Sequence, residues 1–511
     1  MLAPTPLAAL LLVAAAAVVP VAAAALAPVP PDGVSDDCGV FPLAPDAVEQ
    51  IRHRTLQLRG EMPAVGFPTR VRLGAGCGMG TEAAGPLTSR LELQGFGAGR
   101  DGHLRLTPGR PPDALPERLS DRLLPGVRLR AAQPLHSRIL LETDLVVEVG
   151  ARGTGGRAQA LALHVDLGPF YGWVGRRAPA YGPGRSGGLI LSGAVPLDGG
   201  GVGLIEPVGL PGFLEALGPM DLEVALARGS RNGDITAPWL LVGRGTLAPG
   251  AGFTLAVNRG LMFGGDGAAS VTPRLLLLVL AGAHARDDDG EVVPFSNQIA
   301  SAEVAWRGRV ARWPLFAYLE WGMEDNSGAW IRSPGVVSGV EVAHPERPLR
   351  VGLERTYLSG VTGHGIWYRH SVYREGWSDR GRLLGHPLAG PGTEWLLHGA
   401  LHQQPARDGG GRWEVELGFR TRDRLPQNSY APALQGRSYG GFLGARVAVD
   451  GVELFGQVDG ERLRGGDGRW IEGRAGVRWK VGGYGEPRPP RLCRRTGSAR
   501  KSCLRRLPLI F

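Results

Sequence analysis

Trp470–Val481, with the sequence WIEGRAGVRWKV, is the stretch that decides the fold class. Alternate side chains of an extended chain lie on opposite faces, so this stretch has one charged face and one apolar face. The charged positions are Glu472, Arg474, Arg478 and Lys480, and the apolar positions are Ile471, Ala475, Val477, Trp479 and Val481. The stretch is long for a strand of a soluble sheet but matches a membrane crossing, for which about 9–11 tilted residues are enough. It therefore predicts an all-β fold, a transmembrane antiparallel β-barrel.

The same alternation recurs upstream. Within Trp413–Arg422 the apolar residues Trp413, Val415, Leu417 and Phe419 share one face, and Glu414, Glu416, Arg420 and Arg422 share the other. Gly, Pro, Asp or Asn bounds each such segment, and 81 Gly and 41 Pro in 511 residues favour many strands and turns. The other strands expected from Val127 onward are Ile139–Val149, Ala158–Leu167, Leu189–Gly193, Leu222–Arg228, Trp239–Leu247, Phe253–Asn258, Ala302–Val310, Leu315–Trp321, Val336–Val342, Leu349–Leu358, Ile366–Tyr373, Trp395–Gln403, Gly441–Val449 and Val452–Val458.

Connection lengths predict which end of the barrel faces the periplasm. Asp450-Gly451 is a two-residue hairpin signal, and barrels of this class have short periplasmic turns and longer external loops. If the strand ending at Val481 runs toward the periplasm, Asp408–Gly411 and Asp450-Gly451 are periplasmic, and Asp423–Tyr439 and Gly460–Gly468 are external. A soluble periplasmic sandwich or propeller would also alternate, but charged inward faces in successive strands suit a wet lumen better than a packed core.

The amino terminus predicts export. Leu7–Ala27 is nearly all Leu, Val and Ala, and it ends in Ala25-Leu26-Ala27, a small-residue cleavage pattern. We interpret residues 1–27 as a signal peptide. The alternative, an uncleaved helical anchor, is disfavoured because the run is barely long enough to span a membrane and contains Pro20. The expected location is the cell outer membrane.

Outside the barrel, expected over residues 126–481, we predict an appendage and a tail. Residues 28–125 form a small, partly helical appendage, with Asp46–Arg59 and Leu115–Leu124 as helices. Residues 482–511 form a basic tail, predicted to be disordered, that carries +7 of the net charge of +9, so the charge does not indicate a nucleic-acid partner. The four cysteines allow three disulfide pairings, of which we expect Cys38 with Cys77 and Cys493 with Cys503.

Motifs for catalysis and metal binding lack their structural context. Gly184–Gly188 matches the G-x-S-x-G pattern around Ser186, but a hydrolase elbow needs a strand before it and a helix after it. Gly97–Gly102 matches a dinucleotide loop without a βαβ unit. His398 and His402 would share a strand face, but no carboxylate stands with them at metal-ligand spacing. We expect no enzyme activity, no metal and no cofactor.

External loops combine aromatic residues with arginines, which favours recognition. Aromatic rings can cover the apolar faces of sugars, and arginine pairs with carboxylates through a planar fork. The alternative is a set of ordinary loop residues and an interfacial aromatic girdle. The candidate carbohydrate-binding residues are Trp377, Arg380, Arg382, Tyr430, Arg437 and Tyr439.

A series of short segments follows in order over Leu161–Val481: Tyr181–Gly184, Leu189–Ser192, Pro238–Arg244, Phe253–Arg259, Asn297–Ala300, Leu315–Tyr318, Glu324-Asp325, Trp367–His370, Tyr373–Trp377 and Leu384–His386. As a series, these segments resemble the capsule assembly Wzi family. The resemblance implies an outer-membrane barrel of about eighteen strands with a helical amino-terminal part. It also implies a surface lectin for capsular polysaccharide, without catalysis. Gly66–Gly80 and the tail after Val481 have no counterpart in the family pattern.

The sequence therefore predicts a non-enzymatic outer-membrane barrel that binds an acidic capsular polysaccharide or exopolysaccharide. It would promote attachment and organisation of that polymer at the cell surface, as a monomer in contact with outer-membrane lipid. The alternatives are a diffusion porin for sugars or oligosaccharides, and an outer-membrane hydrolase acting on envelope glycans or lipids through Ser186.

Overall fold

The computed structural model describes most of the chain between Arg90 and Val481. The described residues are 39–42, 70–73, 90–102, 124–136, 138–150, 153–193, 195–205, 207–268, 271–272, 296–324, 333–361, 367–380, 382–403, 412–428, 430, 434–449, 452–466 and 468–481. Within these ranges, no helix has the length and apolar character needed to cross a membrane.

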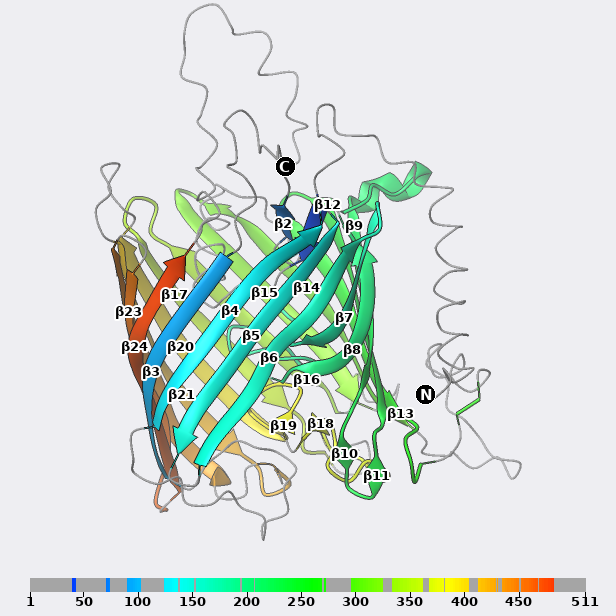
Figure 1. Cartoon of the computed structure of the whole chain (residues 1–511). Coiled ribbons are helices and arrows are strands. Elements are labelled where there is room, and N and C mark those ends of the chain that lie inside the picture. The colour runs from blue at the N-terminus through cyan, green and yellow to red at the C-terminus, as the bar shows by residue number, and fades with distance from the viewer. Residues whose placement is uncertain are drawn as a thin grey trace, which may run out of the picture.

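Eighteen antiparallel strands form one closed barrel, which confirms the predicted fold class (Figure 1). The strands tilt strongly against the barrel axis, as closure of a sheet requires. In chain order they are β3 (Arg90–Gly102), β4 (Leu124–His136), β5 (Ile139–Gly150), β6 (Gly153–Asp166), β7 (Phe170–Arg177), β8 (Leu197–Leu204), β9 (Met220–Arg228), β12 (Trp239–Gly250), β13 (Phe253–Phe263), β14 (Ser296–Val310), β15 (Trp313–Glu324), β16 (Gly335–Ala343), β17 (Leu349–Leu358), β20 (Gly392–Gln403), β21 (Arg412–Arg424), β22 (Gly436–Val449), β23 (Val452–Leu463) and β24 (Arg469–Val481).

The stretch Trp470–Val481 closes the barrel. It lies in β24, which pairs with β23 on one side and with β3 on the other, from Trp470 opposite Gly102 to Val481 opposite Leu91. Figure 1 shows the first and last strands of the barrel side by side. The barrel therefore begins at Arg90, and the predicted boundary at residue 126 is wrong. Four glycines in β3 interrupt its apolar alternation, which is why this strand escaped detection in the sequence.

Little of the predicted appendage falls within the described residues. β1 (Gly39–Pro42) and β2 (Arg70–Leu73) pair as a small separate sheet. The expected helix Asp46–Arg59, nearly all of Leu115–Leu124, the four cysteines, residues 1–27 and the tail 482–511 lie outside the described ranges. These expectations stay predictions.

The barrel wall is apolar outside and polar inside. On β22 to β24 the outward positions Leu443, Leu454 and Ile471 are about half exposed. The inward position Arg478 is buried, and its Nη1 donates to Oε1 of Glu453 on β23 at 2.9 Å. This arrangement is the one that a strand with lipid on one side and a polar lumen on the other requires.

The two ends of the barrel differ in the length of their connections. One end has two-residue turns at Ala251-Gly252 and Ala311-Arg312, and Val449 pairs with Val452 around Asp450-Gly451, which itself is outside the described residues. The opposite end carries the long connections, among them residues 178–196 and 359–391. By the rule of short periplasmic turns, the first end is periplasmic and the second extracellular. The connections before and between β21 and β24 lie at the ends of the barrel that their lengths predicted.

Two predicted strands are not strands. Leu189–Gly193 and the described part of Ile366–Tyr373 lie in the long extracellular connections, and their apolar side chains are buried inside the barrel. An apolar run buried in a lumen has the same composition as one buried in a sheet, so the sequence could not separate the two. β7 and β8 were missed instead, because β8 (LDGGGVGL) has three consecutive glycines and no alternation.

Candidate functional site

Two extracellular loops enter the lumen and pack inside it. We call residues 178–196, between β7 and β8, loop A, and residues 359–391, between β17 and β20, loop B. Leu189 and Ile190 of loop A, and Trp367 and Trp377 of loop B, are fully buried in the core cluster. That cluster also contains inward side chains of the barrel wall, so the loops and the wall share one packed interior.

Carboxylates of the opposite wall hold loop A. Glu354 of β17 accepts the backbone N–H groups of Arg185 at 2.5 Å and Ser186 at 2.9 Å, and the hydroxyl of Tyr318 at 2.5 Å. Ser186 Oγ donates to Glu394 of β20 at 2.8 Å. β20 stands nine strands from β7 in either direction around the barrel, so loop A crosses the full width of the lumen.

Further along loop A, the chain is tied to another wall strand and to loop B. The N–H of Leu189 donates to Glu320 of β15 at 3.1 Å, and Glu320 also accepts the hydroxyl of Ser301 at 2.7 Å. The carbonyl oxygen of Leu189 accepts the Tyr368 hydroxyl at 2.8 Å, and that of Ile190 accepts Trp377 Nε1 at 2.8 Å. The two loops are therefore one unit.

A third connection, residues 229–238 with the short strands β10 (Arg231–Asn232) and β11 (Ile235–Thr236), anchors loop B from the other side. The buried amide of Asn232 donates to the Gly376 carbonyl at 2.7 Å and accepts the Glu375 N–H at 2.8 Å. Ser230 Oγ donates to Asp379 at 3.1 Å. Figure 1 shows β10, β11, β18 (Ser378–Asp379) and β19 (Arg382–Leu383) gathered at the extracellular end.

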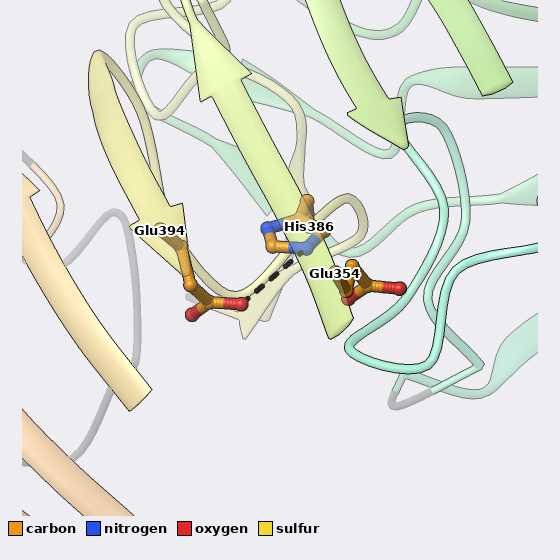
Figure 2. Close-up of side chains that lie close together, drawn as sticks. All are labelled: Glu354, His386 and Glu394. Atoms are coloured by element: carbon orange, nitrogen blue, oxygen red, sulfur yellow. Dashed lines mark ion pairs between the residues drawn. The ribbon is translucent and has the colours of Figure 1, made fainter. Parts of the chain in front are cut away.

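The G-x-S-x-G match is a packing motif. A Cβ at Gly188 would collide with the carbonyl oxygen of Tyr181, so the close approach of the two chain segments requires glycine. Ser186 bonds a carboxylate and not a histidine. His386 lies between Glu354 and Glu394 (Figure 2), but its Nδ1 accepts the N–H of Leu388 at 3.1 Å and its Nε2 bonds Thr356 Oγ1 at 3.1 Å. This arrangement does not provide the serine–histidine contact that a hydrolase needs.

The same cluster could in principle hold a metal ion, because ligand atoms of Glu354, His386 and Glu394 lie within 4.8 Å of one another. Their present partners argue against it. Glu354 accepts two backbone N–H groups and a hydroxyl, and Glu394 pairs with Arg422 and Ser186. Burial lowers the pKa of His386, which agrees with a neutral ring that donates from Nε2. The atoms that could bind a metal ion are therefore already engaged in the contacts that anchor the loops.

Two of the predicted sugar contacts are interior residues. The Trp377 ring is fully buried between the loops. Tyr430 is 6% exposed, and its hydroxyl donates to the carbonyl oxygens of Tyr368 and, at 2.9 Å, Glu375. This burial takes both rings out of the set of candidate sugar contacts. Trp377 packs within loop B, and Tyr430, from the connection between β21 and β22, holds loop B in place.

The other four candidates reach the surface in different directions. Arg380 is exposed at the tip between β18 and β19 and pairs with Asp198 of β8, and Arg382 is half-buried beside it. Arg437 and Tyr439 lie at outward positions of β22, since inward Ser438 between them is buried. Tyr439 thus belongs to the aromatic girdle that was the alternative interpretation.

The sequence missed the wall carboxylates that position the loops and most of the exposed arginines near them. Glu320, Glu354 and Glu394 stand at inward strand positions, which alternation identifies, but their partners are 131 to 208 residues away in the chain. Exposed arginines of loop B and the 229–238 connection form what we call the basic rim: Arg231, Arg369, Arg374 and Arg380. Arg374 pairs with Asp234 at 3.1 Å, and both side chains are about three-quarters exposed.

Three solved structures are similar to this chain. Wzi from Escherichia coli, described as an outer-membrane, carbohydrate-binding β-barrel involved in group 1 capsule assembly, is 19% identical over 76% of this chain and 83% of its own, with a TM-score of 0.57. OccAB2 from Acinetobacter baumannii is 11% identical over 77% of this chain and 98% of its own, with a TM-score of 0.46. OpdQ from Pseudomonas aeruginosa is 10% identical over 77% and 97%, with a TM-score of 0.44.

The search of curated proteins finds no match. Residues 164–404 match the family model described as capsule assembly protein Wzi. This segment runs from β6 to the turn after β20 and includes loops A and B with the carboxylates that hold loop A. Over this segment, nearly half of its length, the chain, an outer-membrane β-barrel, matches the capsule assembly Wzi family.

Proposed function

We propose that this protein is a non-enzymatic surface lectin that retains an acidic capsular polysaccharide or exopolysaccharide on the outer membrane. One observation carries the proposal: loops A and B cross the lumen and are held on both walls. Ser186 of loop A reaches Glu394 across the barrel, and Arg380 of loop B reaches Asp198 on β8. A barrel filled in this way presents a fixed extracellular surface, which favours binding over passage of solutes.

The chemistry of that surface favours an anionic polymer. The basic rim carries four exposed arginines on loops whose backbones are held by buried hydrogen bonds. Arginine pairs with carboxylates through two parallel N–H groups. A polymer repeats its uronate or other acidic groups, so several weak contacts act together through a high effective concentration. A polymer with repeated carboxylates therefore fits the rim better than a neutral one.

The two alternative functions receive less support from the geometry. A diffusion porin needs a continuous aqueous path, whereas Trp367, Trp377 and Leu189 pack inside the lumen. A hydrolase needs an activated nucleophile, whereas the Ser186 hydroxyl donates a hydrogen bond to Glu394 as part of a loop anchor. Wzi from E. coli is described as carbohydrate-binding, which agrees with the proposal.

Gene deletion in an encapsulated host, followed by assay of cell-bound and released polysaccharide, tests the proposal. We expect polymer to move from the cells to the medium, and the full-length protein to restore attachment. A variant with Arg231, Arg369 and Arg374 changed to Gln should fold and restore little. The matched control changes Arg309, Arg312 and Arg347, exposed arginines of the periplasmic end, and should restore attachment fully. Unchanged attachment in the deletion strain would overturn the proposal.

A further inference from the structure

A second group of arginines lies on the outer wall, away from the loops. Arg437 on β22, Arg462 on β23 and Arg469 on β24 are exposed at outward positions near the extracellular strand ends, and Arg464 begins the turn that follows β23. The backbone N–H of Arg464 donates to the carbonyl of Arg437 at 2.8 Å, which keeps the two residues together. We call these four residues the outer patch.

The register makes this patch unusually dense in positive charge. Arg462 stands directly opposite Arg469, and Tyr439, the outward neighbour of Arg437, stands opposite Arg462. Like charges directly opposite one another on neighbouring strands destabilise a sheet. Among the described side chains of this face, Asp423, opposite Arg437, is the one carboxylate. The patch therefore carries a local positive charge that attracts anions to this face of the wall.

The surroundings identify where such an anion comes from. Directly below the patch, toward the membrane centre, the same faces carry Leu443, Val458 and Ile471, each about half exposed. Tyr439, level with Arg462, lies between Arg437 and this apolar band, at the depth where aromatic girdles mark the membrane interface. The arginines therefore stand at the level of the lipid headgroups of the outer leaflet and face the lipid, not the lumen or the basic rim.

We infer that the outer patch binds the phosphate groups of a lipid headgroup in the outer leaflet. Arginine forks match phosphate oxygens in two-point contacts, and the apolar band below receives the acyl chains of the same lipid. This inference is independent of the proposed polysaccharide function, and it assigns Arg437 and Tyr439 to lipid contact in place of sugar contact.

The test uses the full-length protein purified in neutral detergent and titrated with bisphosphorylated lipid A, read out by native mass spectrometry. The patch variant changes Arg437, Arg462 and Arg464 to Gln. Each exposed arginine contributes about fivefold to binding of an anionic lipid surface, so the variant should bind roughly a hundredfold more weakly at low salt. Added salt should reduce the difference in lipid A affinity between the patch variant and the unchanged protein. The control variant, with Arg309, Arg312 and Arg347 changed to Gln, should bind as the unchanged protein does.

Three further arms separate lipid from other anions. Lipid A without phosphates should bind weakly to every variant. Inorganic phosphate alone should not saturate the outer patch. Soluble alginate should bind the patch variant as tightly as it binds the unchanged protein. Heat-modifiable gel mobility confirms that each variant is folded. Equal lipid A affinity of the folded patch and control variants would overturn the inference. A patch variant that loses alginate and keeps lipid A would also overturn it, and would place polysaccharide binding on the outer patch. The first result would leave the proposed role of the basic rim unaffected.

Discussion

At the scale of single residues, Arg380 combines charge with an unfavourable backbone. Its φ is +51°, a region that non-glycine residues seldom occupy, at the turn that joins β18 to β19. Residues with strained backbones cluster at functional sites. The loop keeps arginine where asparagine or glycine would fit the turn better, which agrees with selection for its side chain.

Arg380→Asn separates the contribution of the side-chain charge from that of the backbone conformation. Arg380→Asn removes the exposed ion pair with Asp198, which is worth at most about 1 kcal/mol. Asparagine tolerates the left-handed conformation, so relief of backbone strain should offset this loss and leave the stability of loop B little changed. Loss of one exposed charge should weaken binding of an acidic polysaccharide by about two- to fivefold, measured by affinity electrophoresis with alginate. Arg380→Lys keeps the charge and should retain more affinity than Arg380→Asn. Equal binding by both variants would show that this residue does not contact the polymer.

Ser186 and Gly188 test whether the G-x-S-x-G segment is structural. Ser186→Ala removes one hydrogen bond to Glu394 and should leave capsule attachment intact. Gly188→Ala puts a methyl group against the Tyr181 carbonyl and should destabilise the loop unit by at least about 1–3 kcal/mol, seen as a lower temperature for the shift in heat-modifiable mobility. A hydrolase would show the opposite order, with function lost in Ser186→Ala.

His370 makes loop B sensitive to acid. Burial lowers the pKa of His370 from its usual 6.5 to about 4, and its Nδ1 accepts the N–H groups of Val372 and Tyr373 at 3.1 and 3.2 Å. Between pH 6.5 and pH 4, His370 takes up a proton in the released loop but stays neutral in the docked loop. The stabilising contribution is therefore complete above pH 6.5 and is lost as the pH falls toward 4.

The measurement is hydrogen exchange of residues 367–377 between pH 7 and pH 4, corrected for intrinsic rates. Protection should fall with acidification in the unchanged protein. His370→Asn, which can accept the same type of N–H bond without titrating, should abolish that dependence. His344 makes the same pair of bonds in a periplasmic turn, so His344→Asn is the matched control and should behave as the unchanged protein does.

At the scale of secondary-structure elements, the strands of the carboxyl-terminal half were predictable and the loops were not. Trp413–Arg422 and Trp470–Val481 alternate because one side faces lipid and the other a polar lumen. Their outward residues Phe419 and Ile471 are about half exposed and inward Arg420 and Arg478 are buried. No such local constraint shapes loops A and B. Their conformation depends on contacts with strands more than a hundred residues away, such as the one between Ser186 and Glu394.

The anchoring of loop A depends on Glu354 in particular. It accepts three hydrogen bonds, and each bond to a charged acceptor is worth about 1.5–3 kcal/mol. Glu354→Ala should therefore release loop A and raise the single-channel conductance in planar bilayers. Glu453→Ala is the matched control, because Glu453 is a buried lumen carboxylate paired with Arg478. If Glu453→Ala raises conductance equally, general loss of lumen charge would explain the effect.

At the scale of the whole molecule, barrel closure depends on the pairing between the first and the last strand of the barrel. β24 makes a continuous register with β3 from Trp470 to Val481. A closed barrel leaves no edge strand with unpaired backbone groups in the membrane, where each such group is costly. Loops A and B pack inside the lumen, but the wall alone supplies this closure. The wall should therefore assemble without any segment that follows β24.

Two truncations test that conclusion. A chain that ends at Val481 retains every strand of the barrel and should keep heat-modifiable mobility and protease resistance in the outer membrane. A chain that ends at Gly468 lacks β24, which leaves β23 and β3 as unpaired edges, and should be degraded or aggregate. Mass spectrometry of protease-resistant fragments distinguishes a closed barrel from a partly folded one. Loss of folded protein after truncation at Val481 would show that residues beyond β24 contribute to closure, against the pairing of β24 with β3.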